Sequence, residues 1–363
     1  MEIYMKVLYL KWGYRYDDAV IRAFQAAGLE TEEIFLSEQF QDIAGDIVFS
    51  VNFFAEISAV CQREGVPYCS WVLQLPNFDL YTEAVRNSCN YIGVCDSYLA
   101  EKLWQMGVSK AFFLPDAVEA YTPELKPVER EACFVARRPV QEAWSMDKIS
   151  AYGKGYLDAF IHGQRVLFGA NVLENGLLLK VQKEFVEDNP IPEEVLPECR
   201  RLYLADRYFA PACTALQQDI FLQNFASIMT IYSDGEFEGC DSSVKRPYVD
   251  DEEKRREIFA GKEFTLVLAP HILHNGIPRE LLEVIVAGGF PLAGFQKDYG
   301  YFFERDENLV YFTSPSEFSQ AVVRYGNSAE ERERVRRAAY QTVIAGHTYQ
   351  HRVVTMLEMW ERL

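Results

Sequence analysis

The segment from His274 to Phe290 carries residue types whose spacing suits the binding of a phosphate and a sugar. Gly276 suits a turn, Pro278 suits the first position of a helix, and Gly288-Gly289 suits the end of that helix. We therefore expect a loop, then a short helix near residues 278–287, and then a strand.

Arg279 and Glu283 stand four residues apart on this expected helix, so their side chains share one face near its N-terminal end. In an open α/β sheet that end borders the ligand crevice, where the helix dipole and free N–H groups attract phosphate. A guanidinium there can hold a diphosphate, while a carboxylate one turn later can accept hydrogen bonds from both ribose hydroxyls. The spacing alone also fits a surface ion pair that contributes under ~0.5 kcal/mol.

The histidines offer two further possibilities. His271 and His274 precede the expected helix, where they can reach a bound sugar or simply form the loop. His347 and His351 are four apart and can share a metal ion on one helix face, but no third ligand stands near them. We expect this second pair to help dock the last helix. The chain has no Asp-x-Asp clamp for a divalent ion, so we expect neither a metal nor a cofactor.

Composition limits the classes of protein to which the chain can belong. Its 363 residues, 49% of them apolar, favour two α/β domains with large cores. A net charge of -18 argues against nucleic acid as a partner. The first residues lack the basic start of a signal peptide, and no apolar run approaches the ~20 residues that span a bilayer. The eight cysteines form no C-x-x-C pair, so we expect buried thiols and a cytoplasmic protein without an integral membrane segment.

Short apolar runs alternate with helical spacing, which predicts parallel sheets in two Rossmann-like units. In the first unit we expect a helix that Asp17 caps, and strands at Tyr4–Leu10, Asp46–Val51, Tyr68–Leu73, Tyr91–Val94 and Ala111–Leu114. In the second we expect strands at Ala132–Ala136, Ser227–Tyr232, Phe264–Leu268, Phe290–Ala293 and Leu309–Phe312. Two prolines near residue 125 mark a linker, so the predicted domains are 1–125 and 126–346, followed by a helix over 347–363.

The run from Lys262 through Gly276-Ile277-Pro278-Arg279, Glu283 and Gly288-Gly289-Phe290 to His347-Thr348-Tyr349-Gln350-His351-Arg352 resembles the C-terminal domain of group 1 glycosyltransferases, in the CgeB-like (spore maturation protein-like) branch. Upstream, Val48 to Asn52, Gly65-Val66-Pro67, Trp71, Pro76 and Leu114-Pro115 are similar to the N-terminal domain of that branch. Residues 152–164 resemble its interdomain region, so the resemblance covers almost the whole chain.

The resemblance implies an α/β protein of GT-B fold, in which two Rossmann-like domains face each other across a cleft and a C-terminal helix crosses back to the N-terminal domain. It also implies an enzyme of the hexosyltransferase type, with a nucleotide-sugar donor on the C-terminal domain. The acceptor, a glycan, a protein or a small molecule, would face the N-terminal domain. Glu283 would bind the donor ribose and Lys262 and Arg279 its phosphates, and the donor loop would contain His274, Asn275, Gly276, Ile277 and Pro278.

The sequence departs from the family pattern at several positions. Ala136-Arg137 stands where the branch usually has Gly-Ser, Gln74 replaces an acidic residue, and residues 217–222 lack an expected arginine. Arg137 or Arg138 is expected to substitute for that arginine as a phosphate contact. Gly13 and Asp79 are further candidate phosphate or acceptor contacts. The departures favour the alternative of a non-catalytic nucleotide-sugar binding or accessory protein, and a third possibility is a sugar-nucleotide epimerase.

The distribution of histidines bears on the mechanism. The N-terminal domain has none, so a general base for an inverting transfer would be a carboxylate such as Asp17, Asp79 or Asp96. A retaining transfer, as in much of group 1, does not strictly need that base. We therefore expect a retaining, metal-independent reaction in which Lys, Arg and helix N-termini stabilise the charge of the leaving group.

Overall fold

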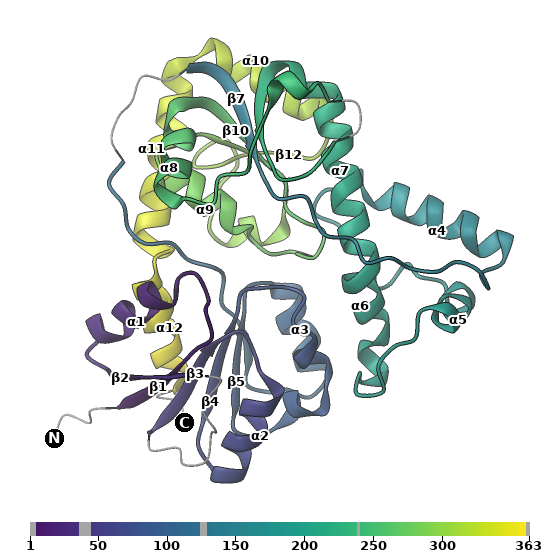
Figure 1. Cartoon of the computed structure of the whole chain (residues 1–363). Helices are drawn as coiled ribbons and strands as arrows, with labels where there is room; N and C mark the ends of the chain where they lie inside the picture. The colour runs from purple at the N-terminus through teal and green to yellow at the C-terminus, as the bar shows by residue number, and fades with distance from the viewer. Residues whose placement is uncertain (1–4, 36–44, 124–128, 238–239, 361–363) are drawn as a thin grey trace. The chain divides into compact units, whose positions relative to one another are not determined.

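The computed structural model describes residues 5–35, 45–123, 129–237 and 240–360 (Figure 1). The chain divides into two compact units. The first contains Met1–Glu119, Pro192–Arg200 and Gly346–Leu363, and the second contains Ala120–Ile191 and Arg201–Ala345. The sequence analysis set its boundaries at 125/126 and 346/347.

The first unit is built on a six-stranded parallel sheet with the strand order β2-β1-β3-β4-β5-β6. The strands are β1 (Lys6–Lys11), β2 (Glu30–Phe35), β3 (Ile47–Val51), β4 (Tyr68–Val72), β5 (Asn90–Val94) and β6 (Ala111–Phe113). The central strands β3, β4 and β5 are buried along their whole length, because helices cover both faces of such a sheet. The edge strand β2 has the sequence E-T-E-E-I-F, and it was not predicted because it lacks an apolar run.

The helices of this unit are α1 (Asp17–Ala26), α2 (Ala55–Glu64) and α3 (Ser97–Gln105), with short 3-10 turns η1 (Phe78–Tyr81) and η2 (Glu83–Arg86). Asp96 caps α3 by accepting hydrogen bonds from the backbone N–H groups of Tyr98 and Leu99. The prediction that Asp17 caps α1 was wrong, because Tyr16 occupies the cap position. The buried Asp17 carboxylate instead accepts a hydrogen bond from the Tyr9 hydroxyl at 2.8 Å.

The C-terminal helix α12 (Tyr349–Trp360) packs into the core of the first unit, as predicted. Figure 1 shows it in yellow beside α1, where Trp360 stacks on Phe24 with ring centroids 6.1 Å apart. The predicted apolar stripe of Val353, Val354, Leu357 and Trp360 is partly wrong, because Val354 is 51% exposed. The residues that bury one face completely are Tyr349, Val353, Met356 and Trp360, which recur every three or four positions.

Arg352 of α12 contacts Pro115 and Asp116, which lie near the end of the stretch Met1–Glu119 of this unit. Its buried guanidinium donates hydrogen bonds to the carbonyl oxygens of Pro115 (2.7 Å), Asp116 (3.1 Å) and Gly346 (2.8 Å). It also lies 2.7 Å from Nδ1 of His347, whose pKa burial lowers to about 3, so this imidazole is a neutral acceptor. His347 therefore helps to dock the last helix.

The second unit also contains a six-stranded parallel sheet, in the order β12-β11-β10-β7-β8-β9. Its strands are β7 (Glu129–Val135), β8 (Met229–Tyr232), β9 (Lys245–Arg246), β10 (Lys262–Val267), β11 (Pro291–Gly294) and β12 (Val310–Phe312). Helices α8 (Glu252–Gly261), α9 (Arg279–Val286), α10 (Pro315–Asn327) and α11 (Ala329–Gly346) follow the strands. Gly288, with φ of +81°, adopts the left-handed conformation that ends α9, as its position after the helix predicted.

A long helical insertion separates β7 from β8. It comprises α4 (Ala151–Gln164), α5 (Leu179–Asp188), the 3-10 turn η3 (Pro197–Cys199), α6 (Arg200–Leu204), the π-helical turn η4 (Ala205–Phe209) and α7 (Ala210–Phe225). Within it, Pro192–Arg200 belongs to the first unit, although the sequence analysis assigned it to the second domain. The segment is held there because Leu196 and Cys199 are buried and because Leu196 donates a backbone hydrogen bond to Tyr81.

Across the described ranges, the structure contains no helix that combines the length and the apolar character needed to cross a bilayer.

Replacing Trp360 by alanine should lower the free energy of unfolding by about 3–5 kcal/mol, because it opens a cavity against Phe24. The matched control is Val354→Ala on the same helix, which should change stability by no more than ~0.5 kcal/mol. Urea unfolding of both variants provides the measurement. Equal stability of the two variants would mean that α12 does not contribute to the core.

Candidate functional site

A cavity of about 280 Å³ opens at the carboxyl ends of β7 and β10 in the second unit, and we call it the β7–β10 cavity. It adjoins α9, which begins at Arg279, as expected for a ligand crevice in an open α/β sheet. Its lining residues come from two strand ends and three helices: Val135, Ala136, Arg137, Pro139, Thr214, Gln218, Tyr248, Arg255, Phe259, Leu268, Pro270, Glu280 and Glu283.

Glu283 lies between two arginines at this cavity. Arg279 Nε donates to Glu283 Oε1 at 2.9 Å, and Arg255 Nη2 is 2.9 Å from Glu283 Oε2. The spacing of Arg279 and Glu283 thus produces the pair on one helix face that it predicted. The sequence analysis missed Arg255 because its charged surroundings, residues 250–257, were interpreted as a solvated face. The available signal was Phe259, four residues later, since both side chains are buried on the inner face of α8.

Tyr248 connects the arginines of the cavity. Its hydroxyl accepts a hydrogen bond from Arg255 Nη1 at 3.1 Å, and the Arg137 guanidinium lies 4.4 Å from the centre of its ring. Arg137 also forms ion pairs with Asp234 and Asp250. The guanidinium of Arg137 is therefore held beside the cavity by an aromatic face and two carboxylates.

Arg138, the next residue, points to α7 instead. Its two terminal nitrogens bind the two carboxylate oxygens of Asp219 at 2.6 and 2.8 Å. Residues 217–222 lack the arginine that the family pattern leads one to expect, and Arg138 brings a guanidinium to this part of α7. Arg138 is not among the described residues that line the β7–β10 cavity, whereas Arg137 is.

Lys262 does not lie at the cavity. It is the first residue of β10, and its ammonium forms ion pairs with Glu129 (2.5 Å) and Glu131 at the start of β7. The cavity is at the other end of these parallel strands. The structure therefore does not bring Lys262 to this cavity, because the first residue of a parallel strand lies at the edge of the sheet opposite the ligand crevice.

The predicted donor loop, residues 274–278, forms the approach to α9. Pro278 is the residue before the helix and not its first residue, and Asn275 accepts a backbone hydrogen bond from Asp298. His274 is buried, with Nε2 3.6 Å from Asp206 Oδ1. His274, Asn275, Gly276, Ile277 and Pro278 are absent from the described lining of the β7–β10 cavity, so the loop positions α9 beside that cavity.

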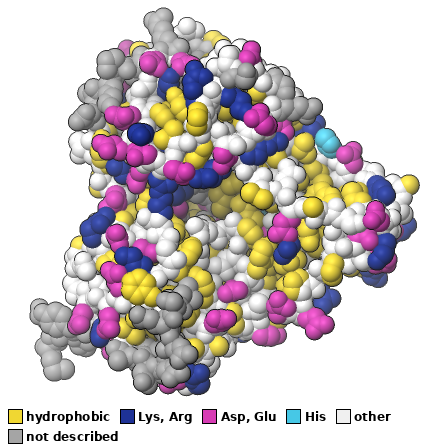
Figure 2. All heavy atoms as spheres, in the orientation of Figure 1, with side chains coloured by type: hydrophobic (Ala, Val, Ile, Leu, Met, Phe, Trp, Pro, Cys, Tyr) yellow, Lys and Arg dark blue, Asp and Glu magenta, His cyan; other side chains and the backbone are white. Residues whose placement is uncertain are grey.

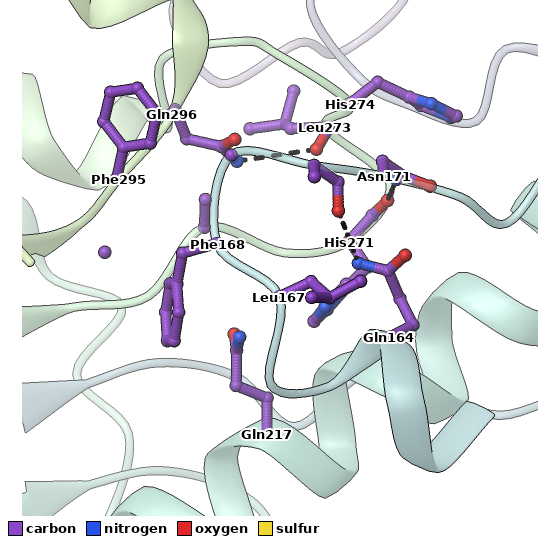
Figure 3. A pocket seen from close by; sticks show the side chains of 14 residues that line it. Gln164, Leu167, Phe168, Asn171, Gln217, His271, Leu273, His274, Phe295 and Gln296 are labelled. Carbon is purple, nitrogen blue, oxygen red and sulfur yellow. Dashed lines mark hydrogen bonds between the residues drawn. The ribbon is translucent and has the colours of Figure 1, made fainter. Parts of the chain in front are cut away.

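A second hollow, shown in Figure 3, has a volume of about 20 Å³, room for a single water molecule. His271 is buried at its wall, where its carbonyl accepts a hydrogen bond from Asn171 Nδ2 at 2.7 Å (Figure 3). Its backbone N–H donates to Thr214 Oγ1 at 2.8 Å. Burial lowers the pKa of His271 to about 4, so the ring is neutral at pH 7. Of the two roles left open for His271, these contacts favour that of forming the loop.

Glu280, in the first turn of α9, lines the β7–β10 cavity, and its carboxyl group is buried. Its Oε1 atom is buried and has no hydrogen-bond partner among the described residues, as is also true of the Tyr299 hydroxyl. Burial, together with the nearby charge of Glu283, raises the pKa of Glu280 well above its ordinary value. Burial thus favours the protonated form of this carboxyl, and that form can donate a hydrogen bond. The burial of Glu280 was not predictable from the sequence, because acids are common in the first turn of exposed helices.

The candidates in the first unit lie near the carboxyl edge of its sheet. Gly13, with φ of +98°, forms the turn after β1. Asp79 accepts a hydrogen bond from the backbone N–H of Ala55 at 2.9 Å. It also lines a cavity of about 690 Å³ with Phe54, Ala55, Glu56, Thr82, Glu83, Ala84 and Glu194. Of the three candidate bases, Asp17 and Asp96 are buried in the contacts described above, and Asp79 faces a cavity.

Two features concern metals and thiols. Within the described ranges, no three His, Cys, Asp or Glu side chains converge on a point where they can hold a metal ion.

All eight cysteines are free, and burial raises the pKa of Cys61, Cys69, Cys133 and Cys213 to about 12, which makes these thiols poor nucleophiles.

Comparisons with known proteins agree with the geometry of the second unit. Residues 229–358 match the model of the family described as "Glycosyl transferase-like". This segment includes Tyr248, Arg255, Glu280 and Glu283, which line the β7–β10 cavity. No curated protein matches the chain.

Two solved structures are similar along nearly their whole length. A glycosyltransferase from Rickettsia africae has a TM-score of 0.50 and 9% identity, over 99% of this chain and 98% of that one. The sucrose-phosphate synthase of Thermosynechococcus elongatus has a TM-score of 0.53 and 8% identity, over the same shares of the two chains. At such low identity the similarity concerns the fold, which is the GT-B fold that the resemblance implied.

Replacing Glu280 by glutamine should flatten the dependence of stability on pH. In the unfolded chain the carboxyl ionises near its ordinary pKa of about 4.3, while the folded protein keeps it protonated, so ionisation costs native stability as pH rises above that value. Glutamine removes this loss. The measurement is urea unfolding at pH 5 and pH 8.

Glu253→Gln, which removes an exposed carboxyl from α8, serves as the control and should retain the wild-type difference in stability between the two pH values. If Glu280→Gln also retained that difference in full, the neutral state of Glu280 would be disproved.

Proposed function

We propose that this protein is a glycosyltransferase that moves a hexosyl group from a nucleoside-diphosphate donor to an acceptor, with retention and without a metal ion. The observation that carries the proposal is the β7–β10 cavity, where Arg137, Arg255 and Glu283 meet beside the N-terminal turn of α9. The glycosyltransferase-like match of residues 229–358 and the fold support it. We also propose that the enzyme belongs to the CgeB-like branch and acts in the cytoplasm. Its acceptor would be a glycan, a protein or a small molecule.

The chemistry of Glu283 suits the ribose of the donor. A carboxylate only accepts hydrogen bonds and has about four lone-pair positions, so this residue type suits the two neighbouring hydroxyls of a ribose. Glu283 contacts Arg255 and Arg279, which hold its carboxylate at the wall of the cavity.

The diphosphate would bind where the cations and the helix end meet. Arg137 lines the same cavity, and the partial positive charge at the N-terminus of α9 favours a negative charge there. As the bond to the sugar breaks, charge grows on the leaving diphosphate, and these fixed groups stabilise it without reorganising.

We propose that the sugar keeps its anomeric configuration because of the contacts that the three candidate general bases already make. Asp17 is bonded to Tyr9 and Asp96 caps α3, so neither carboxylate suits proton abstraction from an acceptor. Asp79 faces a cavity but already accepts a hydrogen bond from Ala55. A transfer on the front face of the sugar does not require a base supplied by the protein.

The second candidate function is binding of a nucleotide sugar without transfer. One observation favours it, namely that the arginines near the site already have carboxylate partners. Arg137 pairs with Asp234 and Asp250, while Arg255 and Arg279 pair with Glu283. A donor phosphate has to compete with these acids, which would suit a weak or regulatory binder.

The experiment that tests the function is a thermal-shift screen with UDP-, GDP-, ADP- and CDP-sugars, followed by an assay of turnover. A ligand that binds the folded state raises the melting temperature. Nucleotide release that depends on an acceptor supports transfer, binding without release supports the second candidate, and a changed sugar without an acceptor indicates an epimerase. The absence of a shift with every donor would contradict both leading proposals.

Glu283→Gln should weaken donor binding by roughly 1–3 kcal/mol, the usual range for a lost charge-assisted hydrogen bond. Calorimetry with the donor found in the screen gives the affinity. Circular dichroism verifies the fold, because Arg255 loses its partner, and Glu253→Gln is the control. Unchanged affinity in a folded Glu283→Gln protein would remove Glu283 from the donor site.

Activity should persist in excess EDTA, because in this proposal arginine side chains and the α9 N-terminus stabilise the diphosphate charge. The measurement is the transfer rate before and after chelation, with re-addition of magnesium or manganese. A rate that vanishes with EDTA and returns with either metal would overturn the metal-independent mechanism.

A further inference from the structure

A buried amide of α7 lies at the wall of the β7–β10 cavity. Gln218 lines this cavity and is only 4% exposed. Its Oε1 atom is buried and has no hydrogen-bond partner among the described residues. An acceptor without a partner costs free energy in the folded protein, because burial removes the water that bonded to it in the unfolded chain. Native proteins keep few such groups, and a ligand that completes the bonding is one reason to keep one.

Neighbouring side chains of α7 do have partners. Gln217 Nε2 donates a hydrogen bond to the Arg165 carbonyl at 3.2 Å. Thr214 lies one turn before Gln218 on the same helix face, and its Oγ1 accepts a hydrogen bond from the backbone N–H of His271 at 2.8 Å. These contacts hold α7 against the loop that follows β10. No described hydrogen bond restrains Oε1 of Gln218, so its amide can turn about the last torsion of the side chain towards a bound ligand.

The charged groups of the cavity already form ion pairs. Arg137 and Arg255 pair with carboxylates, and the Glu283 carboxylate contacts two guanidinium groups. Figure 2 shows basic and acidic side chains next to one another over α8 and α11 of the same unit. A neutral group of a ligand can therefore complete the bonding of Gln218 without competing with an ion pair.

The helices α7 and α9 approach the cavity from opposite faces of the sheet. In the strand order β12-β11-β10-β7-β8-β9, α7 leads from β7 to β8 and α9 leads from β10 to β11, which is the opposite direction. Since crossovers between parallel strands are right-handed, the two helices cover opposite faces. Gln218 of α7 and Glu283 of α9 therefore lie on the two sides of the strand ends that the cavity adjoins.

The parts of a nucleotide sugar differ in what they can offer to Gln218. An ionised diphosphate has only acceptor oxygens, so it cannot donate a hydrogen bond to Oε1. In the arrangement proposed above the ribose binds Glu283, and the base, which is attached to the ribose, stays on that side. The sugar lies beyond the diphosphate, and each of its hydroxyls can both donate and accept a hydrogen bond, as an amide can.

We propose that Gln218 recognises a hydroxyl group of the sugar that the donor carries. Oε1 of the amide accepts a hydrogen bond from this hydroxyl, so that Gln218 helps to select the sugar. The inference rests on the glycosyltransferase function proposed above, because that function supplies the nucleotide sugar.

The experiment compares the affinity for a nucleotide sugar with that for its free diphosphate, in wild type and in Gln218→Met. Methionine is also unbranched and flexible, but it lacks the amide. The probes are UDP-, GDP-, ADP- and CDP-glucose, each with its diphosphate, and calorimetry gives the affinities. For each pair that binds, Gln218→Met should weaken binding of the nucleotide sugar roughly three- to tenfold, the usual contribution of one neutral hydrogen bond, and leave that of the diphosphate unchanged.

The results separate this inference from the proposed function. If wild type binds none of the probes, the proposed function fails, and this inference fails with it. If wild type binds them and Gln218→Met has unchanged affinity for both members of every pair, only this inference is overturned. An equal loss for the two members of a pair would assign Gln218 to the nucleotide, which also overturns it.

Gln217→Met is the matched control, because Gln217 is equally buried but lines the small hollow of Figure 3. It loses the hydrogen bond to Arg165, so its melting temperature should fall while its affinities stay those of wild type. Gln218→Met removes an acceptor that has no described partner, so its melting temperature should be at least that of wild type. A fall as large as that of the control would indicate a structural role and overturn the proposal.

Donors that carry 2-, 3-, 4- or 6-deoxyglucose identify the hydroxyl that Gln218 contacts. Loss of this hydroxyl should weaken binding to wild type by the same factor and should not weaken binding to Gln218→Met, as in a double-mutant cycle. If every deoxy donor weakens binding to wild type and to Gln218→Met equally, the proposal is wrong.

Discussion

The guanidinium of Arg352 is almost completely buried, and a buried charge is tolerated only when its donors are satisfied. Three carbonyl oxygens and the neutral ring of His347 accept hydrogen bonds from these donors. Two of the carbonyls are those of Pro115 and Asp116, far from α12 in the sequence. Burial lowers the pKa of Arg352 to about 10, so the group stays charged at neutral pH. The position of α12 follows from this arrangement, and with it the packing of Tyr349, Val353, Met356 and Trp360 in the core.

A second electrostatic arrangement organises the candidate site. The start of α9 carries a partial positive charge, which opposes the placement of Arg279 and Arg255 beside it. Glu283 offsets this repulsion, since each of its oxygens contacts one guanidinium. The negative charge of one residue therefore allows two cations to stand at a helix N-terminus, within a protein that is strongly acidic as a whole.

Elements with a strong local signal were predictable from the sequence. Buried parallel strands appear as apolar runs, and Pro278 and Gly288 mark the ends of α9. The edge strand β2 was missed because its sequence is polar and parallel pairing with β1 decides its conformation. Lys262 was assigned to the donor through the resemblance alone, although a residue at the start of a parallel strand lies at the amino edge of the sheet. Arg255 was missed because a run of charged residues looks the same in the sequence whether or not one of its side chains is buried. The contact of Arg138 with Asp219 joins residues 81 positions apart, which no local pattern encodes.

The composition of the first unit from three separate stretches of chain has a consequence for protein synthesis. On the ribosome, Phe24 and its neighbours are made before the second unit, but Met356 and Trp360, which cover them, are made after it. The second unit is complete before the first unit can close, which reverses the usual N-terminal-first order of domain folding during translation. Throughout that interval the apolar residues around Phe24 lack the cover that α12 gives them in the folded protein.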